Sequence, residues 1–137
     1  MSLYDILRSA IVSNEFTLFT NQYSNRLCDK DKLNLFHAAC IWNRVNLMDH
    51  MVQNGFKIVP DLKVHTQISH TEERVRPIPI IFECISYAAF QSLEWLLCRG
   101  LSTEAIHPDT GISAYQYAVR CKDNRFTESL IRHAGLG

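Results

Sequence analysis

Residues 33–56 contain two short amphipathic segments back to back, with apolar positions repeating at helical spacing. In the first segment, Phe36, Ala39 and Cys40 fall at i, i+3 and i+4 on one face. Two of these side chains are small, which permits close approach of a second helix. Asn43 is suited to the left-handed conformation that ends a helix. The second segment has one apolar stripe, formed by Leu47, Met48, Met51 and Val52. The pattern predicts a helical hairpin.

The same pattern recurs, more weakly, in three further parts of the chain. Residues 112–135 repeat it near the C-terminus, and residues 79–100 repeat it in the middle. The middle copy is one residue too long, which predicts an enlarged turn around Tyr87. An N-terminal copy keeps the spacing through Leu7, Ala10, Asn14, Leu18, Phe19 and Tyr23. Self-similarity on this scale predicts a stack of repeats rather than one globule.

The best copy resembles the ankyrin repeat. His37 matches the family's His, Ala39 matches the first Ala of its Ala-Ala pair, and Gly55 matches its closing Gly. Asn34 stands where the family has the Thr that begins the first helix, so we expect it to cap that helix. The resemblance implies that His37 is structural and hydrogen-bonds the neighbouring turn.

The fold implied by the resemblance is all-α, an ankyrin-type solenoid of about four helix-turn-helix repeats within a single domain spanning residues 1–137. The first copy lacks its preceding hairpin and is more polar, as in a capping repeat. The expected repeats cover about 3–28, 29–56, 77–101 and 109–136.

An insertion separates the second and third repeats at residues 57–76. Much of it alternates, with Val64 on one side and His65 and Gln67 on the other, which is a strand pattern. We expect an extended, partly β finger. Two alternatives remain open, namely a floppy surface loop and a segment whose apolar residues need cover from the stack or from a partner.

Composition and charge exclude several classes of protein. The chain has 14 Lys and Arg against 14 Asp and Glu, which argues against a generic nucleic-acid binder. No 18-residue apolar run is present, so no membrane span is expected. The N-terminus lacks a basic n-region, so we expect no secretory signal and a cytosolic protein. Four of the five cysteines lie in apolar helical patterns, which predicts buried free thiols in a reducing compartment.

Candidate catalytic and metal-binding residues form no recognised pattern. The spacing of His65, His70 and Cys84 fits no common zinc motif. A Cys–His nucleophile pair needs an exposed thiol of low pKa, whereas the helical cysteines have apolar neighbours. We therefore expect no enzyme activity, no metal and no cofactor from this chain.

In ankyrin stacks the concave surface comes from the hairpin tips and the exposed side of each first helix. The matching positions here are Ile41, Trp42, Ser86, Tyr87, Arg120 and Cys121. Trp42 is the leading anchor, because Trp, Tyr and Arg dominate binding energy at interfaces; the alternative is that it folds onto the turn. Charged tip residues, among them Lys30 and Lys32, set specificity or are ordinary solvated turns. His65 and Gln67 of the finger extend the expected partner-binding set.

The predicted function is protein recognition by a chain that is a monomer when unbound. Divergent copies with many Asn, Phe and Cys resemble the C-terminal ankyrin domains of type III secreted effectors from enteric pathogens, the group that ADP-riboxanates host caspases. That resemblance implies secretion into the host cytosol and recruitment of a host caspase or similar signalling protein. The alternative is a stand-alone inhibitor, such as an immunity protein that blocks a partner enzyme.

Overall fold

The computed structural model describes residues 2–24, 26–65 and 77–134. Within these residues the chain forms eight α-helices and two short strands, which confirms the prediction of an all-α chain with a small β element. The helices are α1 (Leu3–Val12), α2 (Phe16–Gln22), α3 (Asp29–Ile41), α4 (Val45–Gln53), α5 (Ile80–Ser86), α6 (Phe90–Cys98), α7 (Ala114–Cys121) and α8 (Asn124–His133). The strands are β1 (Lys63–His65) and β2 (Pro77–Pro79). No described helix has both the length and the apolar character that crossing a bilayer requires.

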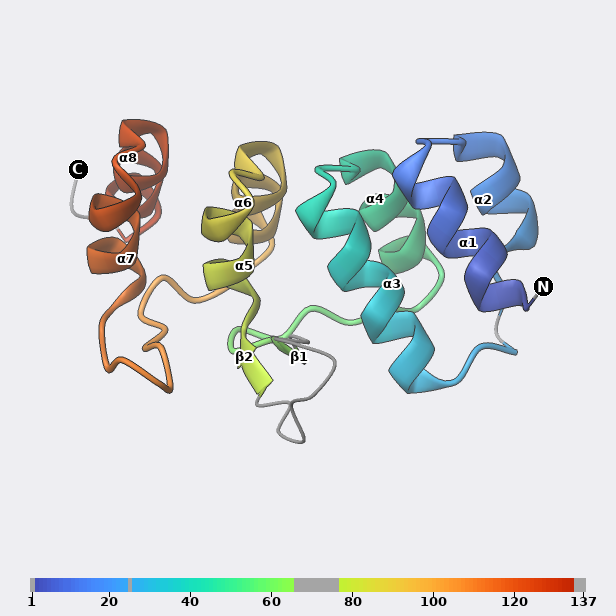
Figure 1. The fold of residues 1–137 in the computed structure, drawn as a ribbon, viewed down its shortest axis with the longest axis horizontal. Coiled ribbons are helices and arrows are strands. Elements are labelled where there is room, and N and C mark those ends of the chain that lie inside the picture. The colour runs from blue at the N-terminus through green and yellow to red at the C-terminus, as the bar shows by residue number, and fades with distance from the viewer. Residues whose placement is uncertain (1, 25, 66–76, 135–137) are drawn as a thin grey trace, which may run out of the picture.

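Consecutive helices pair into four hairpins, and the hairpins lie side by side in one row from the N-terminal to the C-terminal end (Figure 1). The first helices contact one another in the order α1, α3, α5, α7, and the second helices in the order α2, α4, α6, α8. Each hairpin therefore packs mainly on its neighbours in the sequence, and the two terminal hairpins each have one neighbour.

Every hairpin turns through one non-glycine residue with a positive φ angle. These residues are Asn14, Asn43, Ala88 and Lys122, with φ between 53° and 61°. The expectation for Asn43 is confirmed. In the first three turns the N–H of the next residue donates a 2.8 Å hydrogen bond to the carbonyl oxygen five residues back, that of Ala10, Ala39 or Cys84. The four positive-φ residues thus give a common origin for comparing hairpins position by position.

The predicted enlargement of the turn around Tyr87 is wrong. Ala88 and Ala89 form the same tight turn as Asn43 and Arg44. The extra residue of the middle copy falls at the start of its first helix instead, because Pro79 is the residue before α5 rather than its first residue.

The predicted start of the second hairpin at Asn34 is also wrong, since α3 begins at Asp29. Asp29 and Asp31 lie in its first turn, where carboxylates interact favourably with the helix dipole. No Pro or Gly interrupts the residues that follow. Lys30 and Lys32 are therefore helical rather than part of a hairpin tip.

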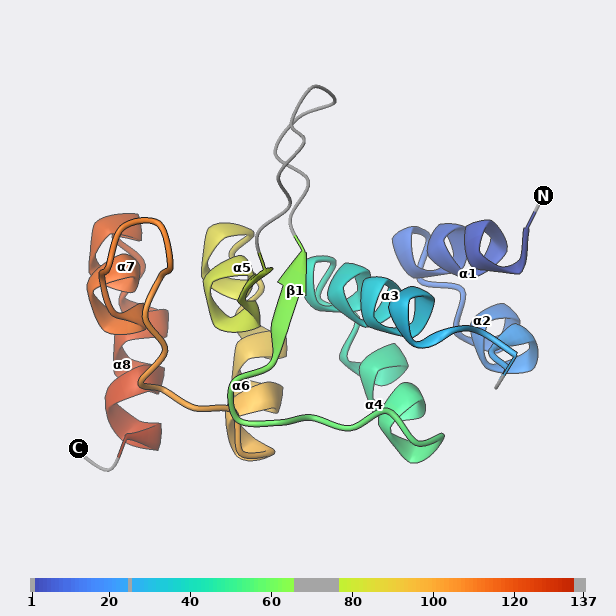
Figure 2. The same ribbon diagram turned by 90° about the horizontal axis from the view of Figure 1, so that it is seen from below.

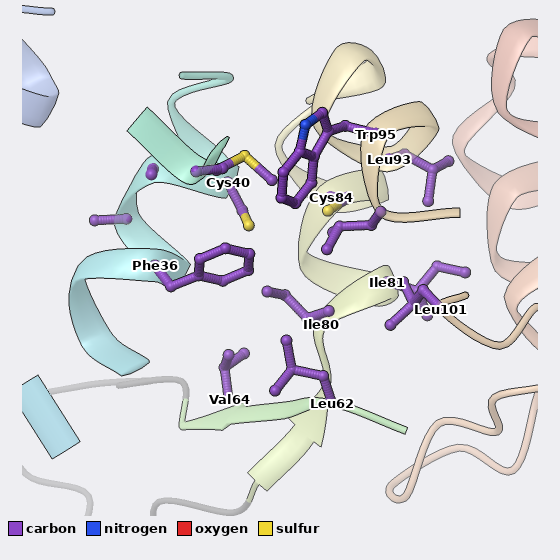
Figure 3. Packing of buried hydrophobic residues seen from close by; sticks show 14 of the residues in the cluster. Phe36, Cys40, Leu62, Val64, Ile80, Ile81, Cys84, Leu93, Trp95 and Leu101 are labelled. Carbon is purple, nitrogen blue, oxygen red and sulfur yellow. The ribbon is translucent and has the colours of Figure 1, made fainter. Parts of the chain in front are cut away.

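Part of the insertion is an integral piece of the core. Strand β1 pairs antiparallel with β2, with Val64 opposite Ile78, and the side chain of Val64 is fully buried. Figure 3 shows Leu62 and Val64 directed toward Phe36 and Ile80. The alternative in which the insertion folds back on the stack therefore holds for these residues. The rest of the expected finger, including Gln67, lies outside the described residues.

Strand β2 was not predicted, because residues 77–79 were assigned to the beginning of a repeat. Pro77 and Pro79 lack the N–H that a central strand would need, but an edge strand tolerates them. The N–H of Ile80 then donates to the carbonyl oxygen of Leu62, at 2.9 Å, so the sheet leads directly into α5.

The core runs between the hairpins as well as within them. Phe36 is fully buried, stacks on Phe56 with ring centroids 4.3 Å apart, and lies near Trp95 (Figure 3). Trp95 is buried and belongs to this core. The guanidinium of Arg99 covers its outer face, 3.8 Å from the ring centroid.

The expectation of buried thiols holds for only two of the five cysteines. Cys40 and Cys84 are buried in the seam between the second and third hairpins, whereas Cys28, Cys98 and Cys121 are exposed. Periodicity alone did not reveal that Cys98 and Cys121 lie on the outer sides of α6 and α7. Burial raises the pKa of the Cys40 thiol well above its usual range, and the Cys84 thiol beside it raises that pKa further.

We therefore expect three thiols to react rapidly with a chromogenic disulfide reagent at neutral pH, and two to react only when the chain opens. Stopped-flow labelling of the native protein checks this result, and labelling in denaturant supplies the total of five. Fast reaction of all five thiols in the native protein would contradict the packing of this seam.

Candidate docking surface

The turns from first to second helix lie along one edge of the row, the upper edge in Figure 1. Trp42 and Tyr87 each immediately precede a positive-φ residue, so they hold equivalent places in the second and third hairpins. Their side chains are 44% and 56% exposed. The structure thus places two aromatic side chains in register on neighbouring hairpins, in the exposed state predicted for Trp42. We call this strip the turn edge; it also includes Ile41, Ser86 and Arg120.

Side-chain hydrogen bonds fix the spacing of the turns along this edge. The Nδ2 of Asn43 donates to Gln91 Oε1 at 2.9 Å, and its Oδ1 accepts from the N–H of Ser92 at 2.8 Å. The buried hydroxyl of Ser92 donates in turn to the carbonyl oxygen of Cys40. These bonds tie the second turn to the start of α6, so Trp42 and Tyr87 are held at a fixed separation.

Arg44 makes the equivalent link to the first hairpin. Its Nε and Nη2 donate to the carbonyl oxygens of Ile11 and Val12, at 3.0 and 2.9 Å. These carbonyls belong to the last turn of α1, where the regular helical hydrogen bonds end; that of Ile11 also accepts from the N–H of Asn14 at 3.2 Å. Arg44 therefore closes the end of α1 and fixes the second hairpin against the first.

Ser86 and Tyr117 link the third hairpin to the fourth through their hydroxyl groups, whose oxygens are 2.5 Å apart. The ring of Tyr117 also meets Phe82 edge to face. Ser86 thus supports the turn edge structurally, although it is exposed there.

The remaining predicted residues divide between two places. Ile41 is partly exposed and Arg120 is exposed, both on the turn edge. Lys30 and Lys32 lie near the start of α3 and His65 ends β1, so these residues lie away from the turns, which follow the other end of the first helices (Figures 1 and 2). Lys32 and Lys30 lie nine and eleven residues before Ile41 on α3, which corresponds to about 14–17 Å along the helix axis. The structure therefore does not bring all predicted residues together, and it says nothing of Gln67, which is not described.

Sequence reasoning missed Val12, which is exposed and lies two residues before Asn14. This is the position that Ile41, Ser86 and Arg120 occupy in the other hairpins. An alignment of Asn14 with Asn43 in the sequence would have identified Val12 as a turn-edge residue. The turn edge thus extends over all four hairpins.

His37 has a different partner from the one that the resemblance implied. Its Nε2 lies 2.9 Å from Glu83 Oε1 on α5, and both side chains are largely buried. The expected bond to a neighbouring turn is replaced by a carboxylate contact between the second and third hairpins. Within the described ranges, no three His, Cys, Asp or Glu residues are placed to share a metal ion.

Comparison of the sequence with protein-family models and with curated proteins gives no match in either case.

Proposed function

We propose that this chain is a protein-recognition module built as an ankyrin-type solenoid. The row of four hairpins with a common turn supports the solenoid, since each unit packs mainly on its neighbours. The matches at His37, Ala39 and Gly55 support the ankyrin type. Recognition rather than catalysis is the role, and the chain acts by presenting a preformed surface.

The observation that carries this function is the pair of exposed aromatic side chains, Trp42 and Tyr87, at equivalent places on the turn edge. Trp, Tyr and Arg are the residue types that most often dominate interface energy, and Arg120 occupies the next hairpin. Because Asn43 and Arg44 fix the turns, little conformational entropy is lost when a partner binds.

The partner that the resemblance favours is a host signalling protein such as a caspase, recruited by a bacterial effector in the host cytosol. The turn edge is mainly apolar in its second and third hairpins and basic at Arg120. A protein surface with an apolar pocket and a nearby acidic residue is the chemistry that fits it.

Capture from host-cell extract, followed by titration of the identified partner, tests the proposal. Trp42→Ala is expected to weaken binding by roughly 30-fold or more, the effect typical of an interface anchor. Tyr115→Ala is the matched control, because Tyr115 is also aromatic and 44% exposed but lies off the turn edge on α7. Equal loss in both variants, or no loss in either, would refute this placement of the site. Capture of a bacterial toxin from a parallel bacterial extract would favour an immunity protein instead.

A further inference from the structure

The two end faces of the row carry apolar side chains at positions that are buried everywhere else. Residues of different hairpins are equivalent when they lie the same number of positions from the positive-φ residue of their own turn. A row of hairpins normally ends in polar faces, because an apolar end face is open to association. Both ends of this row lie far apart (Figure 1).

The C-terminal face is formed by α7. Tyr115 and Val119, seven and three residues before Lys122, are 44% and 50% exposed. The equivalent residues of the first three hairpins, each covered by a following hairpin, are almost completely buried: Leu7, Phe36 and Ile81 for Tyr115, and Ile11, Cys40 and Ile85 for Val119. Tyr115 and Val119 line a shallow hollow along α7 together with Ile112, Gln116 and Arg120. This face therefore has the composition of an internal seam.

The N-terminal face shows the reciprocal pattern. Leu18, four residues after Asn14, is 37% exposed, and Ile6, eight residues before it, is partly exposed. The equivalents in hairpins that have a preceding neighbour are almost completely buried: Leu47, Ser92 and Phe126 for Leu18, and Leu35, Ile80 and Ala114 for Ile6. The first hairpin therefore exposes apolar side chains at two positions that, in each later hairpin, are covered by the hairpin before it.

The acidic residues of the ion pairs across the seams occupy the same position in each hairpin. Six residues after the positive-φ residue, Asp49 pairs with Arg99 of the next hairpin at 3.4 Å, and Glu94 pairs with Arg132 of the next hairpin at 2.6 Å. Glu128 holds this position in the last hairpin and is exposed. At the other end of the row, the exposed Arg26 lies 12 residues after Asn14, whereas Arg99 and Arg132 lie 11 and 10 residues after the positive-φ residues of their turns.

We propose that a second copy of this chain covers the C-terminal face, stacking head to tail so that α7 and α8 of one copy meet α1 and α2 of the next. Tyr115 and Val119 then pack against Ile6 and Leu18, and Glu128 pairs with Arg26. The two faces differ, so the contact is heterologous and extends into open-ended oligomers. This self-association uses neither Trp42 nor Tyr87, although Arg120 of the turn edge also borders the hollow on α7.

Sedimentation equilibrium from roughly 10 μM to roughly 1 mM tests this inference, a range that spans micromolar to millimolar dissociation constants. The weight-average mass is expected to rise with concentration to at least twice the 15.8 kDa of the monomer. A constant mass of one chain throughout would overturn the proposal.

Two single-face variants and their mixture identify the contact. Val119→Lys blocks the C-terminal face and Leu18→Lys blocks the N-terminal face, so each variant alone is expected to stay monomeric. An equimolar mixture retains one intact face of each kind and is expected to form dimers that grow no further. Because only folded chains can pair, the mixture also controls for folding. Association that Val119→Lys abolishes but Leu18→Lys leaves unchanged would mean a symmetric dimer and would overturn head-to-tail stacking.

A charge exchange gives a second readout. Glu128→Lys is expected to weaken self-association and Arg26→Glu to weaken it as well, whereas the chain carrying both changes recovers it. Lack of recovery in the double variant would remove this ion pair from the proposed contact, and unchanged association in both single variants would do the same.

Discussion

Phe36→Ala is expected to lower the free energy of unfolding by about 3–5 kcal/mol, the range typical of a buried Phe truncated in a core. The side chain is fully buried, stacks on Phe56 and lies 6.2 Å from Trp95 between ring centroids. Its loss leaves a cavity where α3 meets α6, and the neighbouring rings are held by other contacts and cannot simply close it.

Urea titration monitored by circular dichroism and by Trp fluorescence measures this effect. The control is Phe16→Ala, which removes an exposed aromatic ring from α2 and should change stability by about 0.5 kcal/mol or less. A similar small loss for Phe36→Ala would show that the seam between these hairpins is not packed as described.

Val64→Asp is expected to be nearly as damaging, with a loss of roughly 3 kcal/mol or more, because it places a carboxylate in an apolar site. Val64 is fully buried beneath α3, although it belongs to an insertion rather than to a hairpin. Lys63→Asp is the matched control, since Lys63 is the exposed neighbour on the same strand. We expect the control to remain close to wild type.

The pH dependence of Val64→Asp gives a second check. Burial raises the pKa of the introduced carboxyl in the folded state, so the folded chain holds its proton to higher pH than the unfolded chain does. The stability lost relative to wild type is therefore largest at neutral pH and shrinks as the pH falls toward about 4. Equal destabilisation by the two substitutions, with no pH dependence, would show that β1 does not pack under α3.

The local sequence predicted the hairpins because their signals are local. The apolar stripe that includes Leu47 and Met51 defines α4, and Asn43 supplies the residue type that tolerates a positive φ. Ala88 takes the same conformation without any such signal, because the packing of the two flanking helices outweighs the cost of left-handed backbone at a single residue. The third turn was therefore mispredicted although its hairpin was recognised.

The candidate docking surface was partly predictable from the resemblance to ankyrin repeats. The resemblance assigned Trp42 and Tyr87 to the expected concave surface, and both side chains are exposed. Lys30 and His65 were assigned to the same surface, yet Lys30 lies in the first turn of α3 and His65 ends β1, both away from the turn edge. Separation along a helix axis depends on where that helix begins, and the start at Asp29 was not recognised.

The sequence by itself determined the helical hairpins and the alternation that buries Val64, because both depend on residue type and spacing over one or two turns of backbone. Only the tertiary structure decided that His37 meets Glu83, that three thiols are exposed, and that Tyr115 and Val119 form an open end face. These features depend on which hairpin lies beside which and on which hairpin has no neighbour. Contacts between residues far apart in the chain leave no periodic signal, so they become visible only once the hairpins are assembled.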